Sequence, residues 1–553
     1  MQLTNTTDYA IRIVCYLAIK KRRVTTAKLC IVWRESEGCP MMLCRLLEDL
    51  DCTLVQGRSD IEVNAICCDS RSVTPGCVFV CLPGQHTDGR RFAHAAAAAG
   101  AAVLVFEGTL PNFEFSRSCS PALVQAEPGK ARRVLALMAS RLYGYPARRM
   151  TMIGITGTKG KTTTAHLLAA VLTAAGRRVG CIGTNGAVWP GQRHTLGYTT
   201  PESCDLQHIL RDMADDGCDA CVMEVSSLGM KFDRAAGIEF DVGVFTNLSP
   251  DHIGPGEHAD FAEYLHWKAA LFQQCRAGVF NIDDPWVGKI VDGVPCRVVT
   301  YGTVPGADVR ADSNFTLTRE GGRLGAAFTV DGVRYTVGMP GAFSVQNALA
   351  ALAAARVLGA GEDAIRRGLA AAVVQGRVEP VAVDAPFTVL IDYAHNEAAA
   401  ESLLRTLRAY TPARLVAVFG CGGERSRLRR FGMGSVCARL ADFCVITEDN
   451  SRSEPVEHIL ADIRAGLKLG NPATPFAEIP DRRQAIYYAL AHAQPGDIVA
   501  ILGKGHETTI ERNGVKEPFV EREVVEEFFS LPSPKGEGGP AGPDEGRLFG
   551  GRP

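Results

Sequence analysis

A run of small, polar and cationic residues interrupts an apolar stretch between residues 152 and 172. The letters MIGITGTKGKTTTAHLLAAVL have the pattern of a buried strand, a glycine-containing turn and a helix. Such a turn directs backbone N–H groups toward one point, and the helix N-terminus adds positive potential, so the pattern favours phosphate binding. Lys161 would contribute a positive charge and Thr162 a hydroxyl for Mg²⁺. The glycines depart from the strict nucleotide-loop spacing, because Ile155 occupies the position of the first glycine.

Three more side chains could do chemistry beside such a loop. Glu224 ends the apolar strand predicted in VMEVSS, where a carboxylate is well placed for Mg²⁺, although a surface ion pair is the alternative. His252 follows a strand predicted to end at Asn247, and is either a metal ligand or a structural histidine. Lys268 lies in an apolar, aromatic helical stretch, 264–272, where a lysine more often extends its amine to the edge of the core.

The bulk properties limit the classes of protein that can carry these residues. A hydrophobic content of 46% and a charged content of 22% are typical of a soluble globular chain. The net charge of −2 argues against a general binder of nucleic acid or anionic membranes. No apolar run reaches the ~20 residues of a membrane-spanning helix, and the basic cluster 20–23 follows the N-terminal apolar run instead of preceding it, unlike a signal peptide. We therefore expect a cytoplasmic protein.

The 19 cysteines are scattered along the chain, and we expect them to be reduced, small apolar residues. One Cys-x-x-Cys pair occurs, at Cys218 and Cys221, with no second pair at zinc spacing. Two partly buried thiols are therefore favoured over a metal or redox site.

With 553 residues, the chain is too long for one hydrophobic core, and three α/β domains are predicted. Their expected bounds are 41–142, 143–375 and 376–530. Strand and helix patterns alternate in the second domain, which predicts a mostly parallel sheet with a nucleotide at the carboxyl ends of its strands. The Pro/Gly-rich tail, 531–553, is expected to be disordered.

Residues 1–40 differ from the rest of the chain. The letters TNTTDYAIRIVCYLAIKKRR resemble the first helix of small winged-helix repressors that sense iron–sulfur clusters. The match covers about twenty residues and includes no cluster-binding cysteine triad. We interpret this segment as an extension from an upstream start or a gene fusion, which gives no support for DNA binding by the whole protein.

Several motifs occur in an order that resembles the Mur ligases of bacterial cell-wall synthesis. They are GITGTKGKTTT, MEVSS, FTNLSPDHIGP and YLHWKAALF, preceded by DSRSVTPGCVFVCLPG and followed by DYAHN, GGER, DNSR and GKGHE. The family loop has the form Thr-Gly-Thr-x-Gly-Lys-Thr, which accounts for the shifted glycines. The resemblance covers about residues 41–529. It implies an N-terminal UDP-binding domain, a central domain of the P-loop type with a mostly parallel sheet, and a C-terminal Rossmann-like α/β domain.

The resemblance implies an ATP-dependent ligation. ATP would phosphorylate the side-chain carboxylate of D-Glu in UDP-MurNAc-L-Ala-D-Glu, and the amine of meso-diaminopimelate would attack the acyl phosphate. The implied cofactors are ATP, Mg²⁺ and a CO₂-derived carbamate on Lys268. The implied partners are the substrates UDP-MurNAc-L-Ala-D-Glu, meso-diaminopimelate and ATP. Binding of nucleic acid and insertion into a membrane are not expected, and we expect a monomer.

The resemblance also assigns residues. The catalytic set is Lys161, His252 and Lys268. The metal ligands are Thr162, Glu224, His252 and Lys268 as its carbamate. The ATP-binding set is Gly157, Thr158, Lys159, Gly160, Lys161, Thr162, Thr163 and Asn347. The contacts to the UDP substrate are Ser70, Thr199, Thr200, Ser226 and Arg234. The amino-acid ligands are Arg425, Asp449, Asn450, Ser451, Arg452, Gly503 and Glu507.

The stretch DNSR bears on which amino acid is added. Relatives that add meso-diaminopimelate carry Asp-Asn-Pro-Arg here, and Arg452 retains the arginine that would pair the distal carboxylate. Arg425 and Glu507 complete a site that complements an end bearing one carboxylate and one ammonium. Ser451 replaces the proline, and its effect on Arg452 stays open.

Other departures from the family pattern affect ligand contacts more than the reaction class. They are Leu228, Ser344, Glu424, Ser426 and Val520. Three different functions stay open: the same ligation with L-lysine, a folylpolyglutamate-type or other Mur ligase, and a DNA-binding regulator with a degenerate ligase body.

Overall fold

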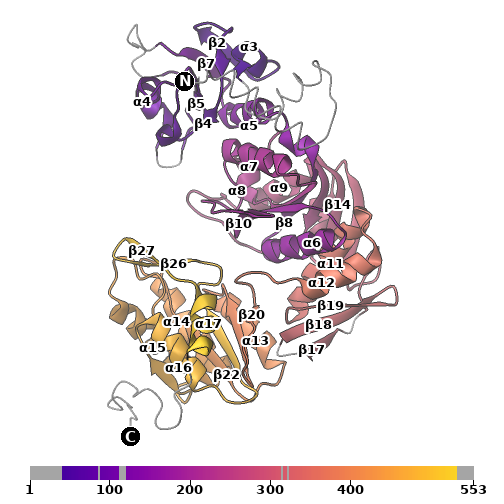
Figure 1. Cartoon of the computed structure of the whole chain (residues 1–553), viewed down its shortest axis with the longest axis vertical. Helices are drawn as coiled ribbons and strands as arrows, with labels where there is room; N and C mark the ends of the chain where they lie inside the picture. Colours follow the sequence, from indigo (N-terminus) through magenta and orange to yellow (C-terminus); the bar gives the residue numbers. More distant parts are fainter. Residues whose placement is uncertain (1–39, 85–86, 111–119, 313–314, 321–322, 532–553) are drawn as a thin grey trace, which may run out of the picture. The chain divides into compact units, whose positions relative to one another are not determined.

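The computed structural model describes residues 40–84, 87–110, 120–312, 315–320 and 323–531 (Figure 1). These residues form two compact units. The first contains the described residues up to Lys159, with Arg177–Val279 and Trp286–Val298. The second contains Gly160–Gly176, Phe280–Pro285 and the described residues from Val299 onward. The predicted extension, 1–40, and tail, 531–553, lie outside the described residues apart from Pro40 and Leu531.

A five-stranded sheet in the first unit has the order β2-β7-β6-β5-β4. Strand β2 is antiparallel to β7, whereas β4 to β7 run parallel. The alanine-rich segment after residue 92 forms a short helix, and the apolar run after it forms a buried strand. The strands are β2 (Cys52–Gln56), β4 (Ile66–Cys67), β5 (Val78–Val80), β6 (Val103–Glu107) and β7 (Ala122–Ala126). The helices are α3 (Leu43–Leu46), α4 (Ala93–Ala98) and α5 (Ala131–Leu142), and β1 (Met41–Met42) pairs with β3 (Glu62–Val63).

A nine-stranded sheet has the order β11-β10-β9-β12-β8-β13-β14-β15-β16. Its centre is parallel, since β12 and β13 both pair in parallel with β8. The carboxyl ends of these strands therefore meet at one edge, where the phosphate loop begins. The central strands are β8 (Thr151–Thr156), β9 (Val179–Gly183), β12 (Ala220–Glu224) and β13 (Phe240–Phe245). The others are β10 (Gly186–Trp189), β11 (Gln192–His194), β14 (Cys275–Asn281), β15 (Arg297–Gly302) and β16 (Val309–Arg310).

Five helices belong to this part of the chain. Helices α7 (Ser203–Asp215), α8 (Ser227–Lys231), α9 (Phe261–Ala269) and α10 (Val287–Val291) lie in the first unit. Helix α6 (Lys161–Ala174) lies in the second, where it packs against α11 (Ala342–Val357) and α12 (Glu362–Ala371). A side chain on Gly368 would come within 2.4 Å of the Val171 backbone, so glycine permits the close packing of α12 on α6.

The second unit ends in a six-stranded sheet of order β20-β21-β25-β22-β23-β24. Only β20, at its edge, is antiparallel to its neighbour among these described strands. The strands are β20 (Glu379–Val381), β21 (Thr388–Asp392), β22 (Leu415–Phe419), β23 (Phe443–Ile446), β24 (Phe476–Glu478) and β25 (Ile498–Leu502). The helices are α13 (Glu397–Arg408), α14 (Arg427–Leu440), α15 (Val456–Gly470), α16 (Arg482–Ala491) and α17 (Glu521–Ser530). Two antiparallel sheets complete the unit. One has three strands in the order β17 (Thr316–Glu320), β18 (Arg323–Val330) and β19 (Val333–Val337), and the other pairs β26 (Thr509–Arg512) with β27 (Val515–Pro518).

The predicted α/β class with successive, mostly parallel sheets is confirmed, while the exact domain bounds remain predictions. Two element bounds differ from expectation. Strand β13 ends at Phe245 because Thr246 and Asn247 turn their polar groups to the phosphate loop. Helix α9 begins at Phe261, capped by the Asp260 carboxylate, and gives way to a 3₁₀ turn, Ala270–Gln274.

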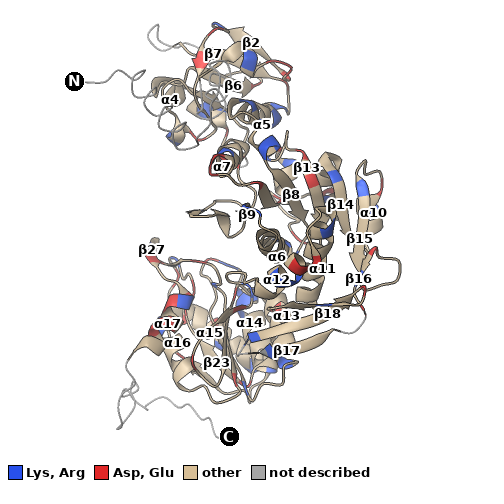
Figure 2. Ribbon diagram, turned by 45° about the vertical axis from the view of Figure 1, so that its right-hand side comes forward, with Lys and Arg blue, Asp and Glu red and all other residues tan. Residues whose placement is uncertain are grey.

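Acidic and basic residues are interspersed along both units, in keeping with the small net charge (Figure 2). Over the part of the chain that the structure describes, no helix has the length and apolarity to span a membrane. All 15 cysteines within the described residues are free thiols, including Cys218 and Cys221. Burial raises the pKa of Cys221 well above its ordinary value, so this pair does not have the character of a reactive thiolate site.

Candidate active site

The phosphate loop joins β8 to α6 and contains two glycines with positive φ. Gly157 has φ +146°, and a Cβ there would lie 1.9 Å from Thr246 Oγ1. Gly160 has φ +84°, and a Cβ there would lie 2.3 Å from Asn347 Oδ1. Both positions therefore require glycine for steric as well as conformational reasons.

In the first unit, the end of β13 holds the loop through Asn247. Its carbonyl accepts from Thr158 N–H at 2.8 Å, and its Oδ1 accepts from Lys159 N–H at 2.9 Å. Asn247 Nδ2 and Thr246 Oγ1 both donate to the carbonyl of Lys159. Two N–H groups that the sequence assigned to the phosphate are thus engaged by Asn247 in this structure, because the loop must be braced against β13. The remaining phosphate donors are expected from Gly160 onward, at the N-terminus of α6.

In the second unit, Asn347 of α11 lies against the start of α6. It is 7% exposed, and its Oδ1 accepts from Thr164 Oγ1 at 3.3 Å. It lies beside Gly160, and its role at the ATP site stays a prediction.

Lys268 lies directly on the phosphate loop. Its Nζ donates to the carbonyl of Gly157 at 2.7 Å and lies 4.6 Å from the centre of the Tyr264 ring. The residue is 2% exposed, so it does not extend its amine to solvent at the edge of the core. The structure thus brings together two predicted site residues that are 111 positions apart.

Glu224 ends β12 and is 2% exposed, which excludes the surface ion pair considered from the sequence. Its carboxylate accepts from Thr184 N–H at 2.8 Å and from Thr184 Oγ1 at 3.3 Å. In the sheet it is registered against Ile155 of β8, immediately before the loop.

The predicted substrate contacts gather around the backbone of Glu224. Thr200 Oγ1 donates to the Glu224 carbonyl at 3.0 Å and lies 3.1 Å from Ser226 Oγ. Arg234 Nη1 donates to the carbonyl of Thr200 at 3.1 Å. Thr199 Oγ1 lies 3.2 Å from Thr184 Oγ1, the residue that also holds the Glu224 side chain.

Ser70 lies in a 3₁₀ turn, Ser70–Ser72, that Asp69 caps. Two residues before it, Cys68 Sγ lies 3.9 Å from Cys204 Sγ in the first turn of α7. This contact places the predicted uridine-side turn beside the helix that follows the two substrate threonines.

The loop after β13 contains two histidines in different surroundings. His252, with φ +53°, is half exposed, and its Nδ1 lies 2.8 Å from Glu257 Oε1. His258 is fully buried, and burial lowers its pKa. The structure therefore shows His252 in a contact with a carboxylate, and its role as a metal ligand stays a prediction.

The donors partly fit a magnesium ion. Mg²⁺ prefers oxygen ligands, which the Glu224 carboxylate and the Thr162 hydroxyl can supply. A lysine ammonium repels a cation, so Lys268 would fit only after conversion to an anionic carbamate. Within the described ranges, no group of three or more His, Cys, Asp or Glu side chains is placed to hold a metal.

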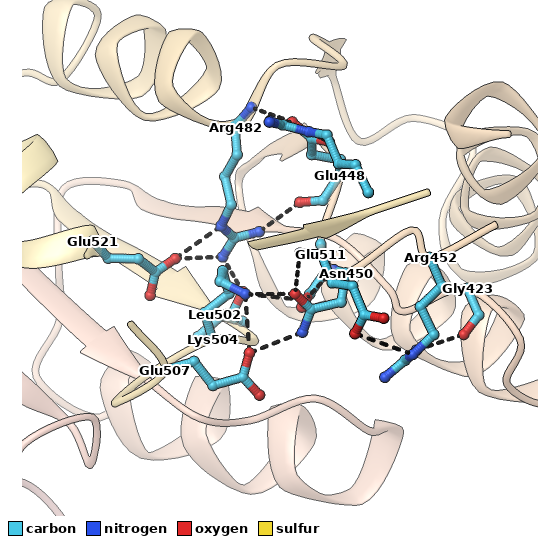
Figure 3. Close-up of polar contacts among 12 residues, drawn as sticks. Gly423, Glu448, Asn450, Arg452, Arg482, Leu502, Lys504, Glu507, Glu511 and Glu521 are labelled. Carbon is cyan, nitrogen blue, oxygen red and sulfur yellow. Dashed lines mark hydrogen bonds and ion pairs between the residues drawn. The ribbon is translucent and has the colours of Figure 1, made fainter. Parts of the chain in front are cut away.

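Six of the seven predicted amino-acid ligands lie on two loops that follow β23 and β25 (Figure 3). Arg425 lies on a third loop, which follows β22. Asn450 Nδ2 donates to Glu507 Oε2 at 2.9 Å, which joins the loops. Gly503 has φ +118°, and a Cβ there would lie 2.8 Å from Asp449 Oδ2. The sequence predicted each of these four residues, and the structure brings them into one cluster.

Arg452 is held in a defined position despite the serine before it. Its Nη1 donates to the carbonyl of Gly423 at 2.6 Å, and its Nε lies 3.9 Å from Glu511 Oε2. Ser451 is 4% exposed, and its carbonyl would lie 1.9 Å from a Cβ on Gly423. Close packing against Gly423 thus fixes the turn before Arg452. Arg425, near the same glycines, is exposed.

Sequence reasoning missed several residues that hold the site. Glu202 accepts from Arg234 Nη2 at 2.6 Å and pairs with Arg132 at 3.3 Å. Lys504 is fully buried, and its Nζ donates to Asn450 Oδ1 at 3.0 Å and to Glu507 Oε2 at 2.9 Å. Lys504 could have been noticed, since it lies inside GKGHE, whereas nothing local distinguishes Glu202.

Three family models match successive parts of the chain. They are "Mur ligase family, catalytic domain" over 62–128, "Mur ligase middle domain" over 155–355 and "Mur ligase, glutamate ligase domain" over 376–505.

Curated relatives match most of the chain. A UDP-N-acetylmuramoyl-L-alanyl-D-glutamate--2,6-diaminopimelate ligase of Caldanaerobacter subterraneus is 36% identical, covering 86% of this chain and 96% of its own. A ligase of the same name from Gloeobacter violaceus is 40% identical over 85% and 94% of the two chains. A solved structure of a protein with this name aligns with a TM-score of 0.62 at 28% identity, covering 89% of this chain and 99% of the other. A Mycobacterium tuberculosis folylpolyglutamate synthase shares the fold, with a TM-score of 0.51 at 24% identity over 66% and 91%.

Proposed function

The chain belongs to the Mur ligase family, and on this premise we propose that it joins meso-diaminopimelate to UDP-MurNAc-L-Ala-D-Glu in peptidoglycan precursor synthesis. Members of the family are ATP-dependent ligases that form an amide bond. A carboxylate is a poor electrophile, so the D-Glu side chain must first receive a phosphoryl group. The amine of diaminopimelate then displaces phosphate from this acyl phosphate, so the products are the amide, ADP and phosphate.

The contact between Lys268 and the phosphate loop carries the mechanistic part of this proposal. Phosphoryl transfer between two anions depends on cations and positioning. Lys161 and the N-terminus of α6 hold the ATP phosphates. Glu224 and Lys268, the latter as a carbamate, hold Mg²⁺, which neutralises phosphate charge when bound. His252 and Thr162 complete the proposed ligand set.

The UDP substrate is held by the side chains clustered around β12. Arg234 is fixed by Glu202 and the Thr200 carbonyl, so its position does not depend on the ligand. Ser226, which caps α8, adds a hydroxyl beside Thr200. Ser70 supplies the uridine-side contact. We further propose that the protein acts as a monomer in the cytoplasm.

The selection of diaminopimelate rests on Arg452. A guanidinium carries five N–H donors, and the bond to Gly423 uses one of them, so a carboxylate can still be bound in bidentate fashion. The ammonium of L-lysine at the same place would be repelled. Glu507 supplies the negative charge for the distal ammonium of diaminopimelate.

The test is an ADP-release assay with UDP-MurNAc-L-Ala-D-Glu, comparing kcat/KM for meso-diaminopimelate and L-lysine. Arg452→Ala is expected to lower kcat/KM for diaminopimelate at least about tenfold, since a lost charge-assisted contact costs ~1.5–3 kcal/mol. Arg464→Ala is the matched control, because Arg464 is a half-buried arginine of α15, away from the ligand loops in sequence and paired with Glu478 at 3.6 Å. Preference of the parent for L-lysine, or unchanged selectivity in Arg452→Ala, would contradict the assignment.

A folylpolyglutamate-type ligase and a DNA-binding regulator would each give a different result. A folylpolyglutamate-type ligase would release ADP with a folate and glutamate, and not with the UDP substrate. The hypothesis of a DNA-binding regulator rests on residues 1–23, which lie outside the described residues. Promoter binding without amino-acid-dependent phosphate release would support it.

A further inference from the structure

A buried arginine links the two loops that carry the proposed amino-acid ligands. Arg482 begins α16, and its side chain is completely buried. Its Nη1 donates to the carbonyl of Glu448 at 2.9 Å, and its Nη2 donates to the carbonyl of Leu502 at 2.8 Å (Figure 3). These carbonyls immediately precede Asp449 and Gly503. One planar guanidinium therefore fixes the separation of both loops at their first residues.

Glu521, the first residue of α17, holds the same guanidinium. Its Oε1 accepts from Arg482 Nε at 2.9 Å and from Nη2 at 2.5 Å, and it too is completely buried. Burial raises the pKa of Glu521, while the charge of Arg482 opposes that shift. Burying two charged groups carries a desolvation cost, and apolar residues in place of such a pair often stabilise a fold equally well. The guanidinium of this pair also binds both loop carbonyls, and this geometry indicates that the pair holds the two loops in position.

The loops approach each other so closely that small movements matter. A Cβ added to Gly503 would lie only 2.8 Å from Asp449 Oδ2. Lys504 binds Asn450 and Glu507 from within the same cluster. These contacts orient side chains, whereas Arg482 holds the backbone from which they project.

We infer that Arg482 is a positioning residue for the amino-acid substrate, acting through the backbone of the loops 448–452 and 502–507. The inference rests on the proposed function, because the ligands on these loops are assigned by it. Arg482 does not touch the substrate. A misplacement of ligands by about 1 Å can cost ~100-fold in rate, so loss of this link should weaken use of the amino acid specifically.

Arg482→Lys tests this inference. Lysine keeps the charge that pairs with Glu521 but cannot donate to both carbonyls through a planar fork. We expect KM for diaminopimelate to rise at least about tenfold, with KM for ATP and the UDP substrate changed less than about twofold. Glu521→Gln, which retains an acceptor oxygen, should raise the same KM by a smaller factor.

Arg414→Lys is the matched control. Arg414 Nη2 pairs at 2.7 Å with Asp497, which is completely buried, and these residues precede β22 and β25. The pair therefore lies at the amino ends of the strands, whereas the ligand loops follow carboxyl ends. Arg414→Lys should leave all three KM values within about twofold of the parent, even where thermal unfolding shows a similar loss of stability.

The outcomes separate the inference from the proposed function. If the parent uses neither diaminopimelate nor L-lysine, the function and the inference both fall. If it uses L-lysine, diaminopimelate addition is rejected, and the same comparison made with L-lysine decides the inference. An unchanged amino-acid KM in Arg482→Lys, or an equal rise in all three KM values, overturns the inference alone. If Arg482→Lys does not fold, Glu521→Gln decides, and failure of both to fold assigns the pair a purely structural role.

Discussion

Replacing Gly160 by alanine should impair the use of ATP by a mechanism that the structure specifies. The added Cβ would lie 2.3 Å from Asn347 Oδ1, which is 0.7 Å short of the 3.0 Å that such a contact needs. Asn347 is buried and bonded to Thr164, so it cannot turn away without losing that bond. We therefore expect the first turn of α6 to move by most of an ångström. A shift of about 1 Å at a reacting group can cost ~100-fold in rate.

Gly176→Ala provides the matched control. Gly176 follows the C-terminus of α6 and has φ +88°, close to the +84° of Gly160, but nothing lies within 4 Å of its added Cβ. Both variants should lose ~1–2 kcal/mol from the unfavourable left-handed backbone. The steric consequence is confined to Gly160→Ala.

The assay measures ADP release against ATP concentration, with thermal unfolding in parallel. Gly160→Ala should lower kcat/KM for ATP by about 100-fold, whereas Gly176→Ala should remain within about twofold of the parent. Normal ATP use by folded Gly160→Ala, or an equal loss in both variants, would refute the reasoning from the Asn347 contact.

Three further predictions concern Lys161, Lys268 and Glu263. Lys161→Met should lower kcat/KM for ATP at least about 100-fold while leaving affinity for the UDP substrate within about twofold, and equal losses would indicate misfolding. Lys268→Ala and Lys268→Met should both abolish ligation, but added acetate should restore part of the activity only in the alanine variant, which has room for it; near-normal turnover in either variant would reject the carbamate. The bond from Lys231 and those from Ala259 N–H and Trp267 lower the pKa of Glu263 from 4.5 to about 2. Its stabilising effect is therefore present above about pH 4.5 and is lost as pH falls toward 2, so acid-unfolding curves of Glu263→Gln should be flatter over that range, and identical curves would contradict this.

The local features of this protein could be predicted from its amino-acid sequence. The phosphate loop, the strand ending at Glu224 and the turn around Asn450 could be predicted because each depends on residues close together in the chain. Parallel strands bring their carboxyl ends to one edge, so a nucleotide site could also be predicted at that edge. The identity of the family followed from the order of these motifs.

Contacts between groups that are distant in the sequence depend on how the elements pack in three dimensions. The bond between Lys268 and Gly157 joins residues 111 positions apart, and no local pattern specifies it. Asn247 accepts hydrogen bonds from two N–H groups of the phosphate loop because β13 pairs with β8. The spacing of the glycines does not predict these contacts.

The same holds for the ligand loops of the second unit. An arginine at the start of a helix gives no sign that its side chain will be buried. Arg482 acquires its partners because α16 and α17 pack together and bring Glu521 to it, while the sheet places β23 and β25 so that both following loops come within its reach. Long-range packing fixes such contacts, since a hydrogen bond requires its two groups to lie within about 3 Å regardless of their separation in sequence.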